Sequence, residues 1–192
     1  SGSCKVLVVT GCMAQRYKNE IIEEVPEVDA VLGTTSYGDI LKAIREAMEG
    51  KHFQEFKDID YLPEKLGKRV LTTGGHFGYL KIAEGCDKHC TYCIIPKLRG
   101  KFRSVPMERL VTQAKEMAEE GVKELILVAQ ETTVYGTDIY GKKSLHILLK
   151  ELCKIKGIRW IRVLYCYPEE IYDELIQTMK EEKKICHYLD LP

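Results

Sequence analysis

Residues 77–83, with the sequence FGYLKIA, open the part of the chain whose repeating pattern decides the fold. Two further apolar segments of strand type follow at similar intervals, KELILVA at 123–129 and IRWIRVLY at 158–165. The intervening segments include helical patterns of apolar residues at 106–120 and 144–155. Strands that alternate with helices in this way are typical of right-handed βαβ units around a parallel sheet.

The alternation continues almost to the last residue. A helix is expected at 169–182 and a fourth strand at 187–191. Three βα units and a fourth strand amount to half of an eight-stranded barrel. We therefore expect residues 77–192 to be the first half of such a barrel, and the chain to be a piece of a longer protein.

A shorter alternation precedes this region and ends near Gly50. It consists of a strand at 5–10, a helix at 13–24 stopped by Pro26, a strand at 29–33 and a helix at 38–49 whose apolar residues are Ile40, Leu41, Ile44 and Met48. Residues 51–76 show little periodicity and are expected to be a linker with at most one short strand. The predicted fold class is α/β, with a partial βαβα (flavodoxin-like) domain over 1–50 and a partial parallel (βα) barrel.

The composition excludes several classes of protein. Among 192 residues, 29 Lys and Arg balance 29 Asp and Glu, so the chain lacks the basic excess of a general DNA- or RNA-coating protein. Hydrophobic residues make up 45%, enough for a folded core rather than a disordered chain. The longest apolar runs, such as 125–129, are too short to span a membrane.

The eight cysteines are the unusual feature of the composition. Because no secretory signal opens the sequence, they favour metal or redox chemistry over disulfide bonds. Cys86, Cys90 and Cys93 have the spacing Cys-x3-Cys-x2-Cys and follow the strand at 77–83, at the edge where α/β folds build their sites. Three thiolates suit one face of a 4Fe–4S cube and leave one iron open to a ligand.

Two other interpretations of this loop stay open. A zinc ion could be held by the three cysteines and a histidine, with His89 or His76 as the fourth ligand. The spacing is not that of a common zinc knuckle, and no second cysteine pair follows. The thiols could also be incidental, although three cysteines within eight residues are rare by chance.

The segment from Gly85 to Cys93, GCDKHCTYC, with an aromatic residue before the last cysteine, resembles the radical S-adenosylmethionine (SAM) superfamily. This resemblance implies that Cys86, Cys90 and Cys93 hold a 4Fe–4S cluster whose open iron binds S-adenosylmethionine. It implies that Tyr92 lies near the adenine. An electron delivered by a donor such as flavodoxin or ferredoxin would cleave the sulfonium to a 5′-deoxyadenosyl radical.

Two stretches near the N-terminus, TGCMAQRY at 10–17 and PEVDAVLG at 26–33, resemble the N-terminal domain of the methylthiotransferases. That resemblance implies a second 4Fe–4S cluster with Cys12 as the last of its three ligands, the other two lying before residue 1. A buried packing role is the alternative for Cys12.

Three later stretches resemble the ribosomal-protein branch of the methylthiotransferases: AQETTVYG at 129–136, LYCYP at 164–168 and YLDLP at 188–192. The implied reaction adds a methylthio group to the β-carbon of an aspartate in small-subunit ribosomal protein twelve, in the cytoplasm. The implied partners are this ribosomal protein and the electron donor, with neither a membrane nor DNA. A tRNA methylthiotransferase and a non-catalytic iron–sulfur or zinc module remain alternatives.

A few other residues carry open expectations. Gln130, with Glu131, ends a strand at the expected site edge and either contacts the cofactor or caps the next turn. The basic residues of KLRGKFR at 97–103 alternate with period two, which fits either an exposed strand edge or an electrostatic role. Cys153 and Cys166 are expected to be packing residues. No catalytic residue could be assigned.

Overall fold

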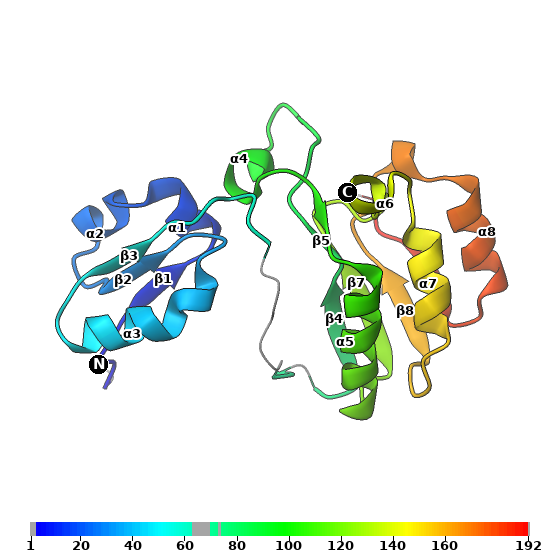
Figure 1. The fold of residues 1–192 in the computed structure, drawn as a ribbon, viewed down its shortest axis with the longest axis horizontal. Coiled ribbons are helices and arrows are strands. Elements are labelled where there is room, and N and C mark those ends of the chain that lie inside the picture. The colour runs from blue at the N-terminus through cyan, green and yellow to red at the C-terminus, as the bar shows by residue number, and fades with distance from the viewer. Residues whose placement is uncertain (1–2, 63–69, 73, 192) are drawn as a thin grey trace. The chain divides into compact units, whose positions relative to one another are not determined.

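A computed structural model describes residues 3–62, 70–72 and 74–191. The chain divides into two compact units, which are taken separately below (Figure 1). The first comprises Ser1–Lys65 with Lys88–Gly100, and the second comprises Leu66–Asp87 with Lys101–Pro192. In the described part of the chain, no helix has the length and apolar character needed to cross a membrane.

The first unit is built on a three-stranded parallel sheet in the order β1-β2-β3. Its elements are β1 (Val8–Thr10), α1 (Cys12–Tyr17), α2 (Glu20–Glu24), β2 (Ala30–Leu32), the 3₁₀ helix η1 (Tyr37–Asp39), α3 (Ile40–Met48) and β3 (Phe53–Glu55). Side chains alternate across the central strand. Ala30 and Leu32 pack with Ala43 of α3, whereas Val31 packs with Ala14 of α1. Both faces of the sheet are therefore covered.

The helix expected at 13–24 is wrong as a single element. The chain turns between α1 and α2 at Lys18, whose φ of 47° lies in the left-handed region, and the Lys18 amide donates to the carbonyl of Ala14 at 2.9 Å. With a ψ of −115°, Lys18 departs from helical geometry, so α1 ends there. The expectation failed because this region has no glycine to announce the break.

The expected apolar face of α3 is also wrong in part. Leu41 and Met48 are 65% and 67% exposed, and the fully packed residues are Ala43 and Ala47. Small side chains let the helix approach the sheet closely. The strand β3 lies within the expected linker, where Phe53 is buried and pairs in register with Ala30.

The second unit confirms the parallel α/β region. Its four-stranded sheet has the order β4-β7-β8-β9, and every neighbouring pair is parallel. The elements are β4 (Phe77–Lys81), α5 (Met107–Glu119), β7 (Glu124–Val128), α6 (Thr137–Tyr140), α7 (Leu145–Cys153), β8 (Trp160–Val163), the 3₁₀ helix η2 (Pro168–Glu170), α8 (Asp173–Glu181) and β9 (Ile185–Leu189). The last strand begins two residues earlier than expected.

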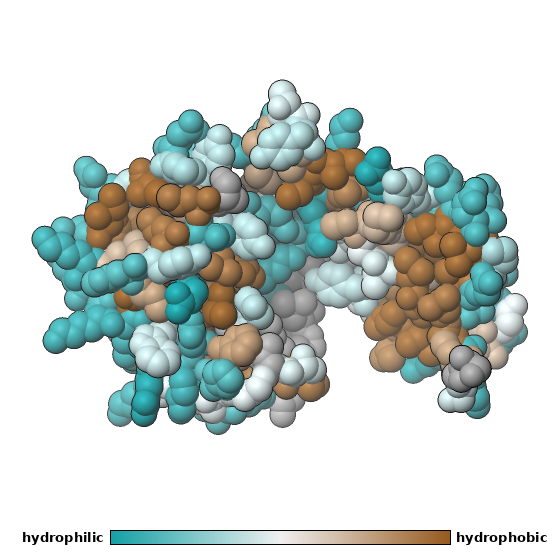
Figure 2. All heavy atoms as spheres, turned by 180° about the vertical axis from the view of Figure 1, so that it is seen from behind, coloured by the Kyte–Doolittle hydropathy of each residue, from teal (hydrophilic) through white to brown (hydrophobic). Residues whose placement is uncertain are grey.

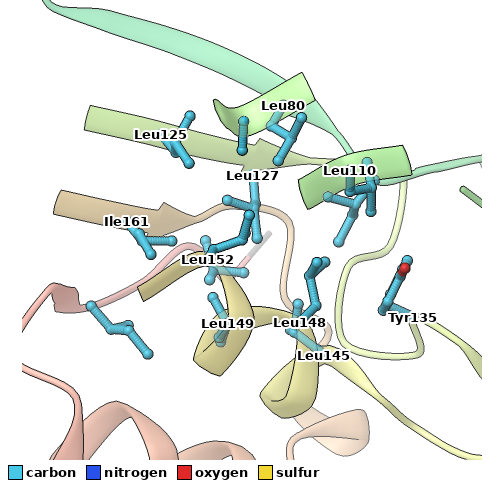
Figure 3. Packing of buried hydrophobic residues seen from close by; sticks show 14 of the residues in the cluster. Leu80, Leu110, Leu125, Leu127, Tyr135, Leu145, Leu148, Leu149, Leu152 and Ile161 are labelled. Atoms are coloured by element: carbon cyan, nitrogen blue, oxygen red, sulfur yellow. The ribbon is translucent and has the colours of Figure 1, made fainter. Parts of the chain in front are cut away.

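The core of this unit lies between the sheet and its helices. Leu80, Leu125, Leu127 and Ile161 point from three strands toward four buried leucines of α7 (Figure 3): Leu145, Leu148, Leu149 and Leu152. Each such side chain contributes on the order of 2 kcal/mol when it leaves water. The alternate strand residues are half-exposed or exposed, because the helices cover only one face (Figure 1). Seen from behind, this unit shows hydrophobic and hydrophilic residues side by side on its surface (Figure 2).

A small antiparallel pair follows the first strand of this sheet. Here β5 (Ala83–Glu84) pairs with β6 (Arg103–Ser104), and between them, in the first unit, the chain forms the short helix α4 (Ile95–Arg99). The expected period-two edge at 97–103 is therefore wrong in its first half, because Lys97 and Arg99 are helical.

Candidate metal centre

Cys86, the first cysteine of the loop, lies in a turn that hydrogen bonds hold in place on both sides. Gly85, with a φ of 77°, precedes Cys86, and its amide donates to Gln130 Oε1 at 2.9 Å. Asp87, which follows, accepts the Phe102 amide on Oδ1 at 3.0 Å. Thus both residues flanking Cys86 are hydrogen-bonded to neighbouring segments of the second unit.

The other two cysteines lie on a turn assigned to the first unit. The Cys93 amide donates to the Cys90 carbonyl at 2.9 Å, and this hydrogen bond closes the turn that carries both cysteines. None of the three loop cysteines forms a disulfide bond, and all three are of intermediate exposure. Tyr92 lies between Cys90 and Cys93. Its side chain is 92% exposed, so packing in a hydrophobic core does not fix its ring.

Within the residues that the structure describes, no three His, Cys, Asp or Glu side chains gather closely enough to hold a metal ion. His76 lies too far from Cys86 to be the fourth ligand of a zinc ion held by the loop cysteines. His76 precedes β4 and Cys86 follows it, and the five residues of β4 alone span about 17 Å. His89 is exposed and stays a possible fourth ligand.

Polar residues follow β7 at the edge of the sheet to which β4 also leads. Gln130 bonds the turn before Cys86, so it contacts the cysteine loop itself. Glu131 is buried, and its Oε1 accepts the amide of Thr133 at 2.8 Å and also the Thr133 hydroxyl. Of the two roles left open for this pair, Glu131 caps the next turn through Thr133, and a cofactor contact by Gln130 stays a prediction.

The ends of β7, β8 and β9 are joined by a second group of bonds that the sequence did not reveal. Thr132 Oγ1 donates to the carbonyls of Leu164 at 2.8 Å and Tyr165 at 3.0 Å. Asp190 Oδ2 accepts the Tyr165 amide at 3.1 Å. The signal in the sequence is a threonine in the loop after one parallel strand and an aspartate directly after another, because residues that follow parallel strands meet at one edge of the sheet.

Cys12 lies at the corresponding edge of the first unit. It begins α1 directly after Gly11, whose φ is 97°, and its sulfur accepts a hydrogen bond from Arg99 Nε at 3.2 Å. Beside it, the carbonyl of Leu98 accepts from the hydroxyl of buried Thr34 at 2.8 Å. The helix α4 that follows the cysteine loop is thereby bonded to the segment around Cys12. Because guanidinium groups only donate, the sulfur of Cys12 is the acceptor.

Of the remaining cysteines, Cys153 and Cys166 are buried packing residues, and Cys186 is of intermediate exposure. Burial raises the pKa of Cys153 to about 11, and burial also raises the pKa of Cys166 and of Cys186. Cys153 and Cys166 are 8% and 0% exposed, as expected for small apolar residues. Raised thiol pKa values disfavour the thiolate that binds metals.

The chain is similar over its whole length to proteins that carry one and the same name. The chain is 66% identical over all of its 192 residues to a protein of Lachnoclostridium phytofermentans named "Ribosomal protein uS12 methylthiotransferase RimO". Proteins of the same name from Clostridium botulinum and Clostridioides difficile are 55% and 50% identical, over 98% and 100% of the chain. The chain spans 43–44% of the length of these relatives.

The family profile described as "Radical SAM superfamily" matches residues 80–192, which is more than half of the chain. The matched region begins in β4, contains the cysteine loop and includes the whole remaining sheet of the second unit. A parallel (βα) arrangement with three cysteines after its first strand agrees with that match. The chain therefore belongs to the radical SAM superfamily.

Proposed function

We propose that the intact protein containing this chain is a radical SAM methylthiotransferase that modifies an aspartate of ribosomal protein uS12 at its β-carbon. The observation that carries the proposal is the 66% identity over the whole chain to a relative named for this activity. The three cysteines after β4 support it, because they lie inside the matched region and have the Cys-x3-Cys-x2-Cys spacing on which the resemblance rests. The ribosomal substrate implies action in the cytoplasm.

Cys86, Cys90 and Cys93 would hold a 4Fe–4S cluster. Their chemistry fits, since none of the three forms a disulfide, all lie on a partly exposed loop, and thiolates are the ligands of such clusters. Binding of the cluster would bring the three thiolates together, because metal binding commonly completes the folding of its site. When bound, the cluster supplies one-electron reduction of S-adenosylmethionine.

The chain's own residues would position the cofactor from two strands. Gln130 fixes the turn that carries Cys86, and its side-chain amide group would donate to the bound S-adenosylmethionine from the end of β7. The exposed ring of Tyr92 would cover the adenine. Both roles rest on the resemblance and on the position of these residues around the cysteine loop.

Cys12 would be a ligand of a second 4Fe–4S cluster in the intact protein. The Arg99 bond supports this role, because it presents the Cys12 sulfur as an acceptor and would offset the charge of a metal-bound thiolate. The electron would come from a small redox protein such as flavodoxin or ferredoxin.

Anaerobic reconstitution of the intact protein tests the proposal. We expect about eight irons and eight labile sulfides per chain, and the loss of about four of each in Cys90→Ala. The matched control is Cys153→Ala, which removes a buried thiol and should keep all the iron. Methylthiolation is then measured by mass spectrometry of uS12.

Two results would contradict the proposal. One is tightly bound zinc without labile sulfide, which would favour a zinc module held by the loop cysteines and His89. The other is a reconstituted enzyme that modifies tRNA and leaves uS12 unchanged.

A further inference from the structure

Tyr165, two residues after the end of β8, has a backbone conformation that tyrosine rarely adopts. Its φ is 59°, and among the described residues only Lys18 is another non-glycine residue with a positive φ. The side chain of an L-residue crowds its own carbonyl in this left-handed region. Such a conformation costs on the order of 1–3 kcal/mol and persists only where the surroundings impose it.

Both neighbouring strand ends impose this conformation. From the β9 side, Asp190 accepts the Tyr165 amide on Oδ2 at 3.1 Å, and its carbonyl accepts the Cys166 amide at 2.8 Å. From the β7 side, the amide and the hydroxyl of Thr132 both donate to the Tyr165 carbonyl at 3.0 Å. The peptide groups on both sides of the Tyr165 Cα are therefore fixed.

Core packing does not account for the tyrosine at this position. Its side chain is 45% exposed, while the next residue, Cys166, is completely buried. Tyr135 shows what a packing tyrosine does in the same unit: it is fully buried, and its hydroxyl donates to the Val105 carbonyl at 2.7 Å. Lys18 has a local explanation, because its positive φ ends α1. Tyr165 lies two residues beyond the end of β8 and ends no helix.

The position of Tyr165 points to a ligand. It stands at the edge of the sheet where β4 leads to Cys86 and β7 leads to Gln130, two strand spacings or about 10 Å from β4. A tyrosine offers a large amphipathic contact surface with few rotatable bonds, which suits recognition of a polypeptide.

We propose that Tyr165 is a specificity-determining residue whose ring contacts the polypeptide substrate, held in place by the strained backbone between Thr132 and Asp190. This inference rests on the proposed function and names the residue through which the same site recognises its protein substrate. The ring contributes to binding of uS12, and the reductive cleavage of S-adenosylmethionine does not depend on it.

The test uses three substitutions in the intact, reconstituted protein. Tyr165→Gly removes both the ring and the strain, so the variant should unfold at a higher urea concentration than the wild type while its KM for uS12 rises tenfold or more. Tyr165→Asn, whose side chain also tolerates the left-handed region, should show the same rise in KM. Tyr165→Phe keeps the ring and should stay within about threefold of the wild-type KM.

Two controls separate binding from structure. Lys18→Gly relaxes a comparable backbone position and should leave the KM for uS12 unchanged. Cleavage of S-adenosylmethionine without uS12 should be equal in the wild type and in all Tyr165 variants. A protein that is stabilised and yet binds its substrate more weakly is a result that a purely structural role for Tyr165 would not produce.

The inference is overturned if Tyr165→Gly or Tyr165→Asn retains the wild-type KM, or if Tyr165→Phe loses as much as Tyr165→Gly. It is also overturned if Tyr165→Gly unfolds at a lower urea concentration, because the strain would then be absent. A wild-type enzyme that leaves uS12 unmodified gives a different result, since it contradicts the proposed function and the inference together.

Discussion

At the scale of the single residue, the buried thiol of Cys153 should make the stability of the protein depend on pH. Burial, reinforced by Glu182, raises the pKa of this thiol from 9.0 to about 11. The folded state therefore keeps the proton to a higher pH than the unfolded state. The resulting stability is complete below pH 9 and is lost as the pH rises through 11, which amounts to about 3 kcal/mol at most.

Cys153→Ala should consequently show a weaker fall in the free energy of unfolding between pH 8 and pH 11 than the wild type. The difference is measured by urea denaturation at each pH. Cys4→Ala, which removes an exposed thiol, is the control for the loss of a cysteine as such. Parallel curves for wild type and Cys153→Ala would show that the thiol is not protected by burial.

At the scale of the element, the short helix α6 is bounded by two left-handed glycines. Gly136 at its start has a φ of 89°, and Gly141 at its end has a φ of 69°. A Cβ added at Gly136 would lie 2.7 Å from the Ser144 Cβ, whereas nothing lies within 4 Å of a Cβ at Gly141. The two positions thus differ in available space while sharing a backbone conformation.

Gly141→Ala should lower the free energy of unfolding by about 1 kcal/mol, because only the left-handed backbone opposes it. Gly136→Ala should lower it by about 3 kcal/mol, since overpacking against Ser144 adds to the same backbone cost. Urea denaturation of the two variants measures the difference. Equal losses would mean that the loop around Ser144 moves aside at no cost.

At the scale of the whole molecule, the two units differ in the size of their cores. Among the described residues, the second unit has one continuous buried cluster, whereas the buried residues of the first form two small clusters. Since stability rises with buried apolar area, the units should open separately.

Hydrogen exchange of the 192-residue chain should show this order directly. Amides of β7 and β8 should exchange slowest, and amides of β1 to β3 should exchange at least about 100-fold faster, a difference of about 3 kcal/mol in opening free energy. Mass spectrometry of peptic fragments resolves the strands. Equal protection of both sheets would indicate one cooperative core instead of two.

The sequence determined the α/β class and the parallel order of the second unit, and it predicts the residues of the candidate cluster site. Its strands and helices carry strong, regular apolar patterns, and α5 and β7 lie within two residues of their expected ends. The three cysteines were identifiable because their spacing lies within one short loop. Such features are local, so the sequence displays them directly.

Other features depended on contacts between distant residues. The break at Lys18, the helix α4 within the basic segment and the burial of Ala43 in place of Leu41 follow from packing between segments far apart in the chain. The bond from Arg99 to Cys12 joins residues 87 positions apart, and Thr132 and Asp190 hold Tyr165 from two other strands. Only the tertiary structure could decide these, because hydrogen bonds and close packing depend on which segments meet in space, and no local pattern records that.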